Sequence, residues 1–154
     1  MATREKHDQG QEGRERQEGL DGWEGRRAGG LTSLVAWQRA DDLFINLHQL
    51  TTKHFPDFER FELSSQLRRA AYSVPANIVE GFARRYRRSR LHFLNISESS
   101  LAEVWYCLHA AKRLGYITEQ QFTKFESELN GVGAPLQGLI RSTKSMPREI
   151  DPGT

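Results

Sequence analysis

The chain has 154 residues, 37% of them hydrophobic and 27% charged, and its formal net charge at pH 7 is +2. This length predicts one domain, and the near-neutral charge excludes a uniformly basic or acidic protein. No run of about 18 apolar residues occurs, so a membrane-spanning segment is not expected. Cys107 is the only cysteine, so an intramolecular disulfide is impossible and a cytoplasmic location is expected.

Residues 1–30 differ in composition from the rest of the chain. They hold seven glycines, six basic and seven acidic residues, and Leu20 and Trp23 are their only large apolar side chains after Met1. Such a segment buries too little surface to offset its chain entropy. We predict disorder for residues 1–30, either as a charged tail or as an extension upstream of the true start. The pair Arg26-Arg27 does not open an export signal, because no apolar segment follows it.

A first helix is predicted to begin after Thr32 or Ser33, since either hydroxyl can cap it. It should end near Lys53, because the following Phe55-Pro56 disfavours helical backbone. We expect Phe55, Phe58 and Phe61 to close one end of a bundle. The apolar face of this helix consists of Ala36, Ala40, Leu43, Phe44, Leu47 and Leu50.

A second helix follows, with Ser64 or Ser65 as its expected cap. Pro75 lacks an N–H and its ring clashes with the carbonyl of Ala71, so a kink or a short break is expected there. Gly81 weakens the last turns. The helical spacing of the apolar residues holds across the proline, at Leu63, Leu67, Ala71, Val74, Ile78 and Phe82.

A third, long helix is predicted from about Ser89 to Leu114, with Gly115 at the position beyond its end. Its apolar residues form two sets that together cover roughly half of the helix circumference. A helix that packs only within one bundle needs an apolar face of about a third of its circumference. We infer from this surplus that the protein forms a homo-oligomer. The sets are Leu91, Leu94, Leu101, Trp105 and Leu108, and Phe93, Ser97, Ser100, Val104, Cys107 and Ala111.

The fourth helix opens with a capping box, Thr118 to Gln121, and a hydrophobic staple of Ile117 and Phe122. Its core stripe consists of Phe122, Phe125, Leu129, Val132, Leu136 and Leu139, interrupted by Gly131, Gly133 and Pro135. A bend or frayed turn is therefore expected over residues 130–135. The predicted organisation is an all-α, up-and-down four-helix bundle over residues 31–145 with a kinked second helix, followed by a flexible tail over 146–154.

Catalytic and metal-binding patterns are absent from the sequence. No Glu-x-x-His pair occurs, so neither a di-iron site nor another metal or cofactor is expected. No nucleophile elbow or phosphate-binding glycine loop is present, and no small-molecule substrate is evident. Cys107 is interpreted as a small core residue. We expect a protein that is not an enzyme.

Three polar residues have both a catalytic and a structural interpretation. Glu98 falls among the apolar residues of the third helix, where a carboxylate is either a general acid in a pocket or a partner in a buried ion pair or hydrogen bond, for example with Arg68 or Arg69. We favour the buried pair. Asn77 and Glu80 are expected to bond backbone groups near Pro75 and not to be reactive.

Three motifs lie on the second helix, in this order: Gln66-Leu67-Arg68-Arg69-Ala70-Ala71, Ser73-Val74-Pro75-Ala76-Asn77-Ile78 and Glu80-Gly81-Phe82-Ala83-Arg84. Together with Trp37-Gln38-Arg39-Ala40, Phe55-Pro56, Phe93-Leu94 and Ser100-Leu101-Ala102-Glu103, they resemble the bacterial four-helix-bundle family of 23S rRNA-intervening-sequence proteins. The resemblance covers about residues 34–144. It implies an up-and-down four-helix bundle, assembly as a homopentamer, and a link of some members to insertions in ribosomal RNA genes.

Residues 64–90 carry seven arginines and one acid, Glu80, and thus a net charge of +6. Arginine contacts phosphates and stacks on bases, and tyrosine also stacks on bases. We therefore predict a non-catalytic oligomeric adaptor that binds nucleic acid, RNA or DNA with RNA preferred. The alternative is a protein–protein scaffold whose arginines contact an acidic partner or an adjacent subunit. The predicted nucleic-acid-binding residues are Arg84, Arg85, Tyr86, Arg87, Arg88 and Arg90.

Overall fold

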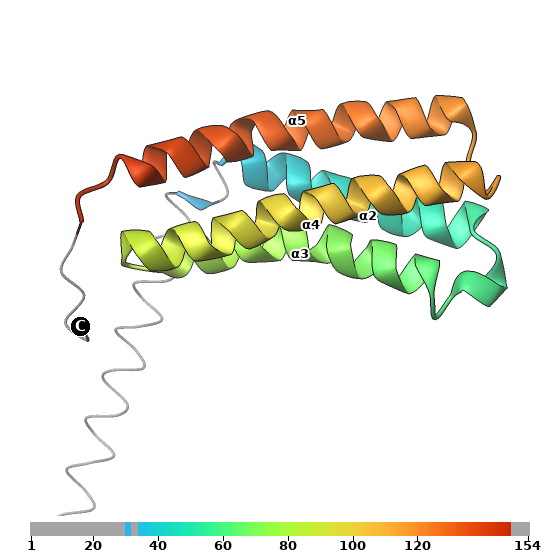
Figure 1. Ribbon diagram of the computed structural model, residues 1–154, viewed down its shortest axis with the longest axis horizontal. Helices are drawn as coiled ribbons and strands as arrows, with labels where there is room; N and C mark the ends of the chain where they lie inside the picture. Colours follow the sequence, from blue (N-terminus) through green and yellow to red (C-terminus); the bar gives the residue numbers. More distant parts are fainter. Residues whose placement is uncertain (1–29, 32–33, 149–154) are drawn as a thin grey trace, which may run out of the picture. The chain divides into compact units, whose positions relative to one another are not determined.

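The computed structural model describes residues 30–31 and 34–148 in two units, residues 1–33 and 34–154. The described part of the second unit, residues 34–148, contains four helices, and no strand occurs among the described residues. The predicted all-α class is confirmed. The predicted disorder of residues 1–29, the caps Thr32 and Ser33, and the end of the chain over 149–154 lie outside the described residues. The helices are α2 (Val35–His54), α3 (Leu63–Ala83), α4 (Arg87–Arg113) and α5 (Glu119–Lys144), with a 3₁₀ turn, η2, at Asp57–Glu59 (Figure 1).

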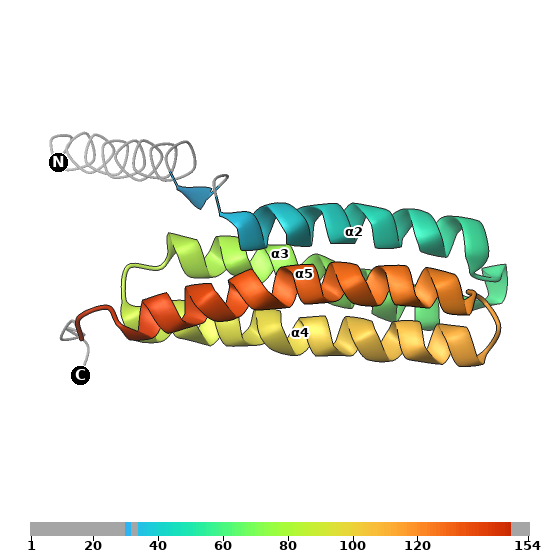
Figure 2. The same ribbon diagram turned by 90° about the horizontal axis from the view of Figure 1, so that it is seen from above.

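The four helices run alternately up and down, as predicted (Figures 1 and 2). The α2–α3 and α4–α5 connections lie at one end of the bundle. The α3–α4 connection lies at the other end, together with the start of α2 and the end of α5. Each helix packs against its neighbours in chain order, and α5 closes the bundle against α2.

The start of α3 differs from the prediction that Ser64 or Ser65 caps it. The helix begins at Leu63, and the residue before it gives no side-chain cap. Instead, Glu59 of η2 accepts from the backbone N–H of Leu63 at 3.0 Å through Oε2 and from the Tyr116 hydroxyl at 2.9 Å through Oε1. This carboxylate therefore ties the α2–α3 connection to the α4–α5 connection.

Only one of the three phenylalanines expected to close this end of the bundle is buried. Phe55 is 7% exposed, and its ring packs 5.6 Å from that of Tyr116. Phe58 and Phe61 are 73% and 84% exposed, so the prediction is wrong for these two residues. Phe58 lies in η2 and Phe61 in the turn that follows it, and neither backbone segment leads its side chain over the core.

The helix α3 continues through Pro75 without a break, and the side chains around the proline form a polar network. Asn77 Nδ2 donates to both the carbonyl and the hydroxyl oxygen of Ser73, at 2.8 Å each. Ser100 of α4 in turn donates to the same hydroxyl at 2.7 Å. The backbone contact predicted for Asn77 is therefore present. It joins Asn77 to Ser73 across the helical turn that contains Pro75.

Two small residues let α3 and α4 approach closely. Ser97 is fully buried and donates to the carbonyl of Val74 at 2.8 Å. Gly81 is also buried, and a Cβ added there would lie 3.2 Å from the backbone oxygen of Arg90 and 3.4 Å from Cβ of Phe93. A methyl group at position 81 is therefore tightly placed, and a larger side chain has no room unless the first turns of α4 move.

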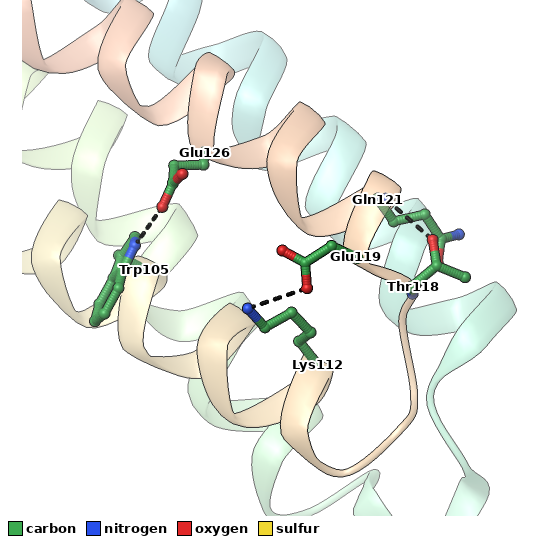
Figure 3. Close-up of polar contacts among 6 residues, drawn as sticks. All are labelled: Trp105, Lys112, Thr118, Glu119, Gln121 and Glu126. Carbon is green, nitrogen blue, oxygen red and sulfur yellow. Dashed lines mark hydrogen bonds and ion pairs between the residues drawn. The ribbon is translucent and has the colours of Figure 1, made fainter.

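The two apolar sets of α4 face two different neighbours within the chain. The second set faces α3 and includes the buried Ser97, Ser100, Val104, Cys107 and Ala111. The first set borders α5, where Trp105 donates to Glu126 at 3.0 Å (Figure 3). The wide arc is thus largely explained by two seams inside one chain, and it is not an independent argument for an oligomer.

Local signals at both ends of the α4–α5 connection are confirmed. Gly115 has a φ of 80°, and the amides of Gly115 and Tyr116 bond back to Lys112 and Ala111, which is the Schellman arrangement. The capping box is complete: Gln121 N donates to Thr118 Oγ1 at 3.1 Å, and Thr118 N donates to Gln121 Oε1 at 2.8 Å (Figure 3).

The predicted bend or frayed turn over residues 130–135 is not observed as a break, because α5 runs unbroken through Pro135. A proline leaves the carbonyl four residues earlier without its helical donor, here Gly131. Arg39 of α2 supplies the missing bond, with NH1 2.9 Å from the Gly131 oxygen. Val132 and Leu136 on the same stretch are fully buried, so core packing holds the helix on either side of the proline.

This arrangement predicts that Arg39 and Pro135 are energetically coupled. Replacing Arg39 with methionine should lower the free energy of unfolding by about 1 kcal/mol, since the carbonyl of Gly131 loses its donor. In a Pro135→Ala background the alanine N–H restores the helical bond, so the same Arg39 replacement should cost much less. Urea unfolding of the two single variants and the double variant measures the coupling. Equal costs in both backgrounds would show that Arg39 does not act through Gly131.

Candidate nucleic-acid interface

The arginine cluster is divided between a short connection and the start of a helix. Arg84 and Arg85 lie in the α3–α4 connection, and Tyr86 is the residue before α4. Arg87, Arg88 and Arg90 lie in the first turn of α4. The helical geometry of this turn sends the guanidinium groups in different directions, so the five arginines are not equivalent.

Two of the arginines hold the end of α5. Arg87 NH1 donates to the carbonyl oxygens of Lys144 and Met146 at 2.9 and 3.2 Å. Arg90 NH1 lies 3.7 Å from the Met146 sulfur, and its NH2 donates to the Arg84 carbonyl at 3.1 Å. Both side chains are half-buried. Their contacts bind the α5 terminus to the α3–α4 connection, including Met146, which the sequence assigned to the flexible tail.

The other three arginines are exposed. Arg84 forms an ion pair with Glu80 on the same helical face and also lies over the ring of Phe93, 4.6 Å from its centroid. Arg85 lies 5.9 Å from the centroid of the Tyr86 ring. Within the part of the chain that the structure describes, neither Arg85 nor Arg88 has a carboxylate partner. We call Arg84, Arg85 and Arg88 the outer arginines.

Further cations reach the same end of the bundle from α5. Residues 80–90 and 141–148 contain eight cations and one acid, Glu80. We call this region the basic end. Sequence reasoning identified the five arginines before and within α4 but missed Arg141, Lys144 and Arg148. Those three are separated from the cluster by more than 50 positions, and only the up-and-down topology brings them to the same end.

The start of α4 adds to the positive potential of the basic end. Tyr86 provides no side-chain cap, and the first turn contains no acid. The first amides of a helix carry partial positive charge and favour anions, so arginines there raise the electrostatic energy of the isolated protein. A bound anion would lower that energy.

The remaining motif residues occupy structural positions. Arg68 Nε donates to Thr51 Oγ1 at 2.7 Å, and Arg69 NH2 lies 3.4 Å from Ser65 Oγ. Glu80 pairs with Arg84 and not with the backbone near Pro75, so that expectation is wrong for Glu80.

Glu98 is exposed, and the prediction of a buried carboxylate paired with Arg68 or Arg69 is wrong. Four residues advance a helix by about 40° beyond a full turn, so Glu98 lies about 40° past Leu94. The buried arc of α4 extends from Leu94 in the opposite direction, through Ser97 and Val104. Glu98 therefore borders the core without entering it.

Neither a metal centre nor an activated thiol is evident among the described residues. No group of three His, Cys, Asp or Glu side chains there could hold a metal ion. Burial raises the pKa of Cys107 to about 11, which disfavours the reactive thiolate. None of the described helices is long and apolar enough to cross a membrane.

Comparison with known proteins adds two findings. The model of a family described as 23S rRNA-intervening sequence protein matches residues 32–138. A crystal structure of a protein with unknown function, from the S23 ribosomal protein family of Bacteroides thetaiotaomicron, is 23% identical with a TM-score of 0.65. The alignment covers 70% of this chain and 96% of that chain, and at this identity it supports the fold alone. No curated protein matches the chain.

Proposed function

The chain belongs to the family of 23S rRNA-intervening sequence proteins, and from this premise we propose that it is a non-catalytic protein that binds nucleic acid, RNA in preference to DNA. The observation that carries the proposal is the basic end. There, the exposed Arg85 and Arg88 have no carboxylate partner in the described chain, and eight cations accompany one acid. Guanidinium groups bind phosphates in two-point contacts.

The outer arginines and Tyr86 are assigned to the nucleic acid in this proposal. Arg85 and Arg88 contact phosphates, and Arg84 joins them when its exposed pair with Glu80 opens, which costs little. Tyr86 is half-buried beside Arg85, and in this proposal the face of its ring stacks on an unpaired base. Arg87 and Arg90 position this surface by holding the end of α5.

We also propose that the protein acts as a homo-oligomer, a pentamer by its family resemblance. Tyr72 of α3 and Tyr106 of α4 are 60% and 64% exposed, and tyrosine is enriched at protein–protein interfaces. A ring of identical subunits would present several basic ends to one RNA and add their affinities. The proposal places the protein in the cytoplasm.

The proposal is tested by titrating labelled structured RNA and duplex DNA with the protein over a series of salt concentrations. Light scattering gives the mass of the free and bound species. Tight binding that weakens steeply with salt, by a species larger than one chain, is the expected result. Failure to bind either nucleic acid at low salt, with the assembly intact, would contradict it and favour an acidic protein partner for the arginines.

A further inference from the structure

A pocket of about 200 Å³ lies between the last turn of α2 and the first turns of α5, at the end of the bundle opposite the basic end. Its floor is apolar, formed by Leu50 and Phe125, which are 6% and 5% exposed. Its wall is polar and contains no carboxylate: the lining side chains are Asn46, Gln49, Lys53, His54, Gln121 and Lys124.

The two lysines of this pocket are not neutralised within the described chain. The ion pairs there are Arg84–Glu80 and Lys112–Glu119, and neither includes Lys53 or Lys124. These lysines come from different helices, so the packing of α2 against α5 places two exposed lysine side chains on the lining of one pocket. Lys124 Nζ lies 6.0 Å from the centroid of the Phe125 ring, over the apolar floor. Two like charges on one lining favour an anion between them.

The capping box orients the side-chain amide of Gln121 toward the neighbouring histidine. Gln121 Oε1 accepts from the amide of Thr118, so the amide nitrogen of Gln121 must face His54, 3.3 Å from Nε2 (Figure 3 shows Thr118 and Gln121). An amide nitrogen only donates, so this contact suits the tautomer in which His54 Nε2 accepts. His54 thus keeps one N–H donor that the contact with Gln121 does not use.

The adjoining hollow limits how far an anion extends along the α2–α5 seam. It shares Asn46 with the pocket but is lined by Asp42 and Glu128. The hollow is also lined by Arg39, whose guanidinium group bonds the Gly131 carbonyl, so its charged side chains sum to −1 (one cation and two anions). This negative lining disfavours a second phosphate group along the seam. The pocket suits one anionic group, with a small apolar substituent on the floor.

From these observations we propose that the pocket binds a single phosphate group, as inorganic phosphate or as the monoester of a small alcohol. Lys53 and Lys124 supply the charge, and Leu50 and Phe125 contact the ester group when one is present. The site does not depend on the proposed nucleic-acid function, since it uses none of the residues of the basic end.

The test is calorimetric titration of the full chain with inorganic phosphate and with phenyl phosphate, with chloride keeping the ionic strength constant. Saturable binding of one ligand per chain is expected. Lys53→Gln with Lys124→Gln should weaken it at least about tenfold, because two charged hydrogen bonds are lost. Tighter binding of phenyl phosphate identifies a monoester site, and tighter binding of inorganic phosphate identifies a free-phosphate site.

Three further variants separate this site from general attraction of anions. Gln121→Glu preserves the capping box but adds a negative charge to the wall, so it should abolish binding while the melting temperature is maintained. Arg113→Gln removes an exposed cation outside the pocket, and Arg85→Gln with Arg88→Gln removes two at the basic end. Both should leave phosphate affinity unchanged. Absence of saturable binding, or equal weakening in these control variants, would overturn the proposal.

Discussion

Replacing Arg85 and Arg88 with glutamate is expected to lower the affinity for RNA by about 100-fold or more. Both side chains are exposed, and neither has a carboxylate partner in the described chain, so the change removes phosphate contacts and adds repulsion. Within the described chain it breaks no ion pair of these guanidinium groups and removes only the contact of Arg85 with the Tyr86 ring. Helical content and the mass of the assembly should therefore be preserved. A fluorescence titration at fixed salt, with circular dichroism and light scattering, measures all three quantities.

A matched control comes from the opposite end of the bundle. Arg60→Glu with Arg113→Glu changes the net charge of the chain by the same amount, at two exposed cations far from the basic end. RNA affinity should fall far less in this variant. If both double variants lose affinity equally, the protein attracts RNA only through its net charge, and the assignment of the basic end is wrong. If the assembly dissociates in the Arg85 and Arg88 variant, these arginines belong to a subunit interface.

Gly81→Val is expected to lower the free energy of unfolding by about 3 kcal/mol. A Cβ at this position already lies 3.2 Å from the backbone oxygen of Arg90, and backbone cannot yield by rotating a side chain. The two γ methyl groups of valine add volume in the same place with a stiff χ1. The strain falls on the α3–α4 junction, so RNA affinity should also decrease. Urea unfolding measures the loss of stability.

Gly81→Ala provides the matched comparison for this prediction. Alanine gains about 1 kcal/mol of helix propensity over glycine, and the tight Cβ contact offsets that gain. We expect a stability within about 1 kcal/mol of the natural protein for alanine, and a large loss for valine only. A valine variant as stable as the alanine variant would show that α4 can move away from α3 without cost.

Features set by a few neighbouring residues could be predicted from the sequence. The capping box needs only Thr118 and Gln121, and the end of α4 needs only a glycine at position 115 that tolerates positive φ. The apolar spacing across Pro75 also identified a continuous helical face, and the buried residues Leu67, Val74 and Ile78 lie on it. The resemblance to the family supplied the up-and-down topology of the bundle.

Features that depend on contacts between distant residues could not be predicted. Pro135 and its two neighbouring glycines indicated a frayed helix. The prediction failed because the donor that replaces the missing N–H belongs to Arg39, almost 100 positions earlier. The same limit applies to Glu59, which serves in place of a serine cap and also bonds Tyr116 from another connection. In each case the partner is chosen by packing of helices and not by local spacing.

The basic cluster illustrates the same limit at the candidate site. Counting charges located the cluster, but it treated five arginines as equal. Only the return of α5 to this end distinguishes Arg87 and Arg90, which bind its terminus, from the outer arginines. Glu98 was misplaced for a related reason: an apolar arc shows which residues border the core, and only the neighbouring helices decide where the core ends.

The most direct test of the account is the salt dependence of RNA affinity for the natural protein beside an Arg85→Gln, Arg88→Gln variant. Each phosphate contact contributes about 0.7 to 0.9 to the slope of log affinity against log salt concentration. If these two arginines contact phosphates, the slope of the variant should be shallower by about 1.5 per bound chain. An unchanged slope, with RNA still bound, would show that the nucleic acid binds elsewhere and would contradict the proposed interface.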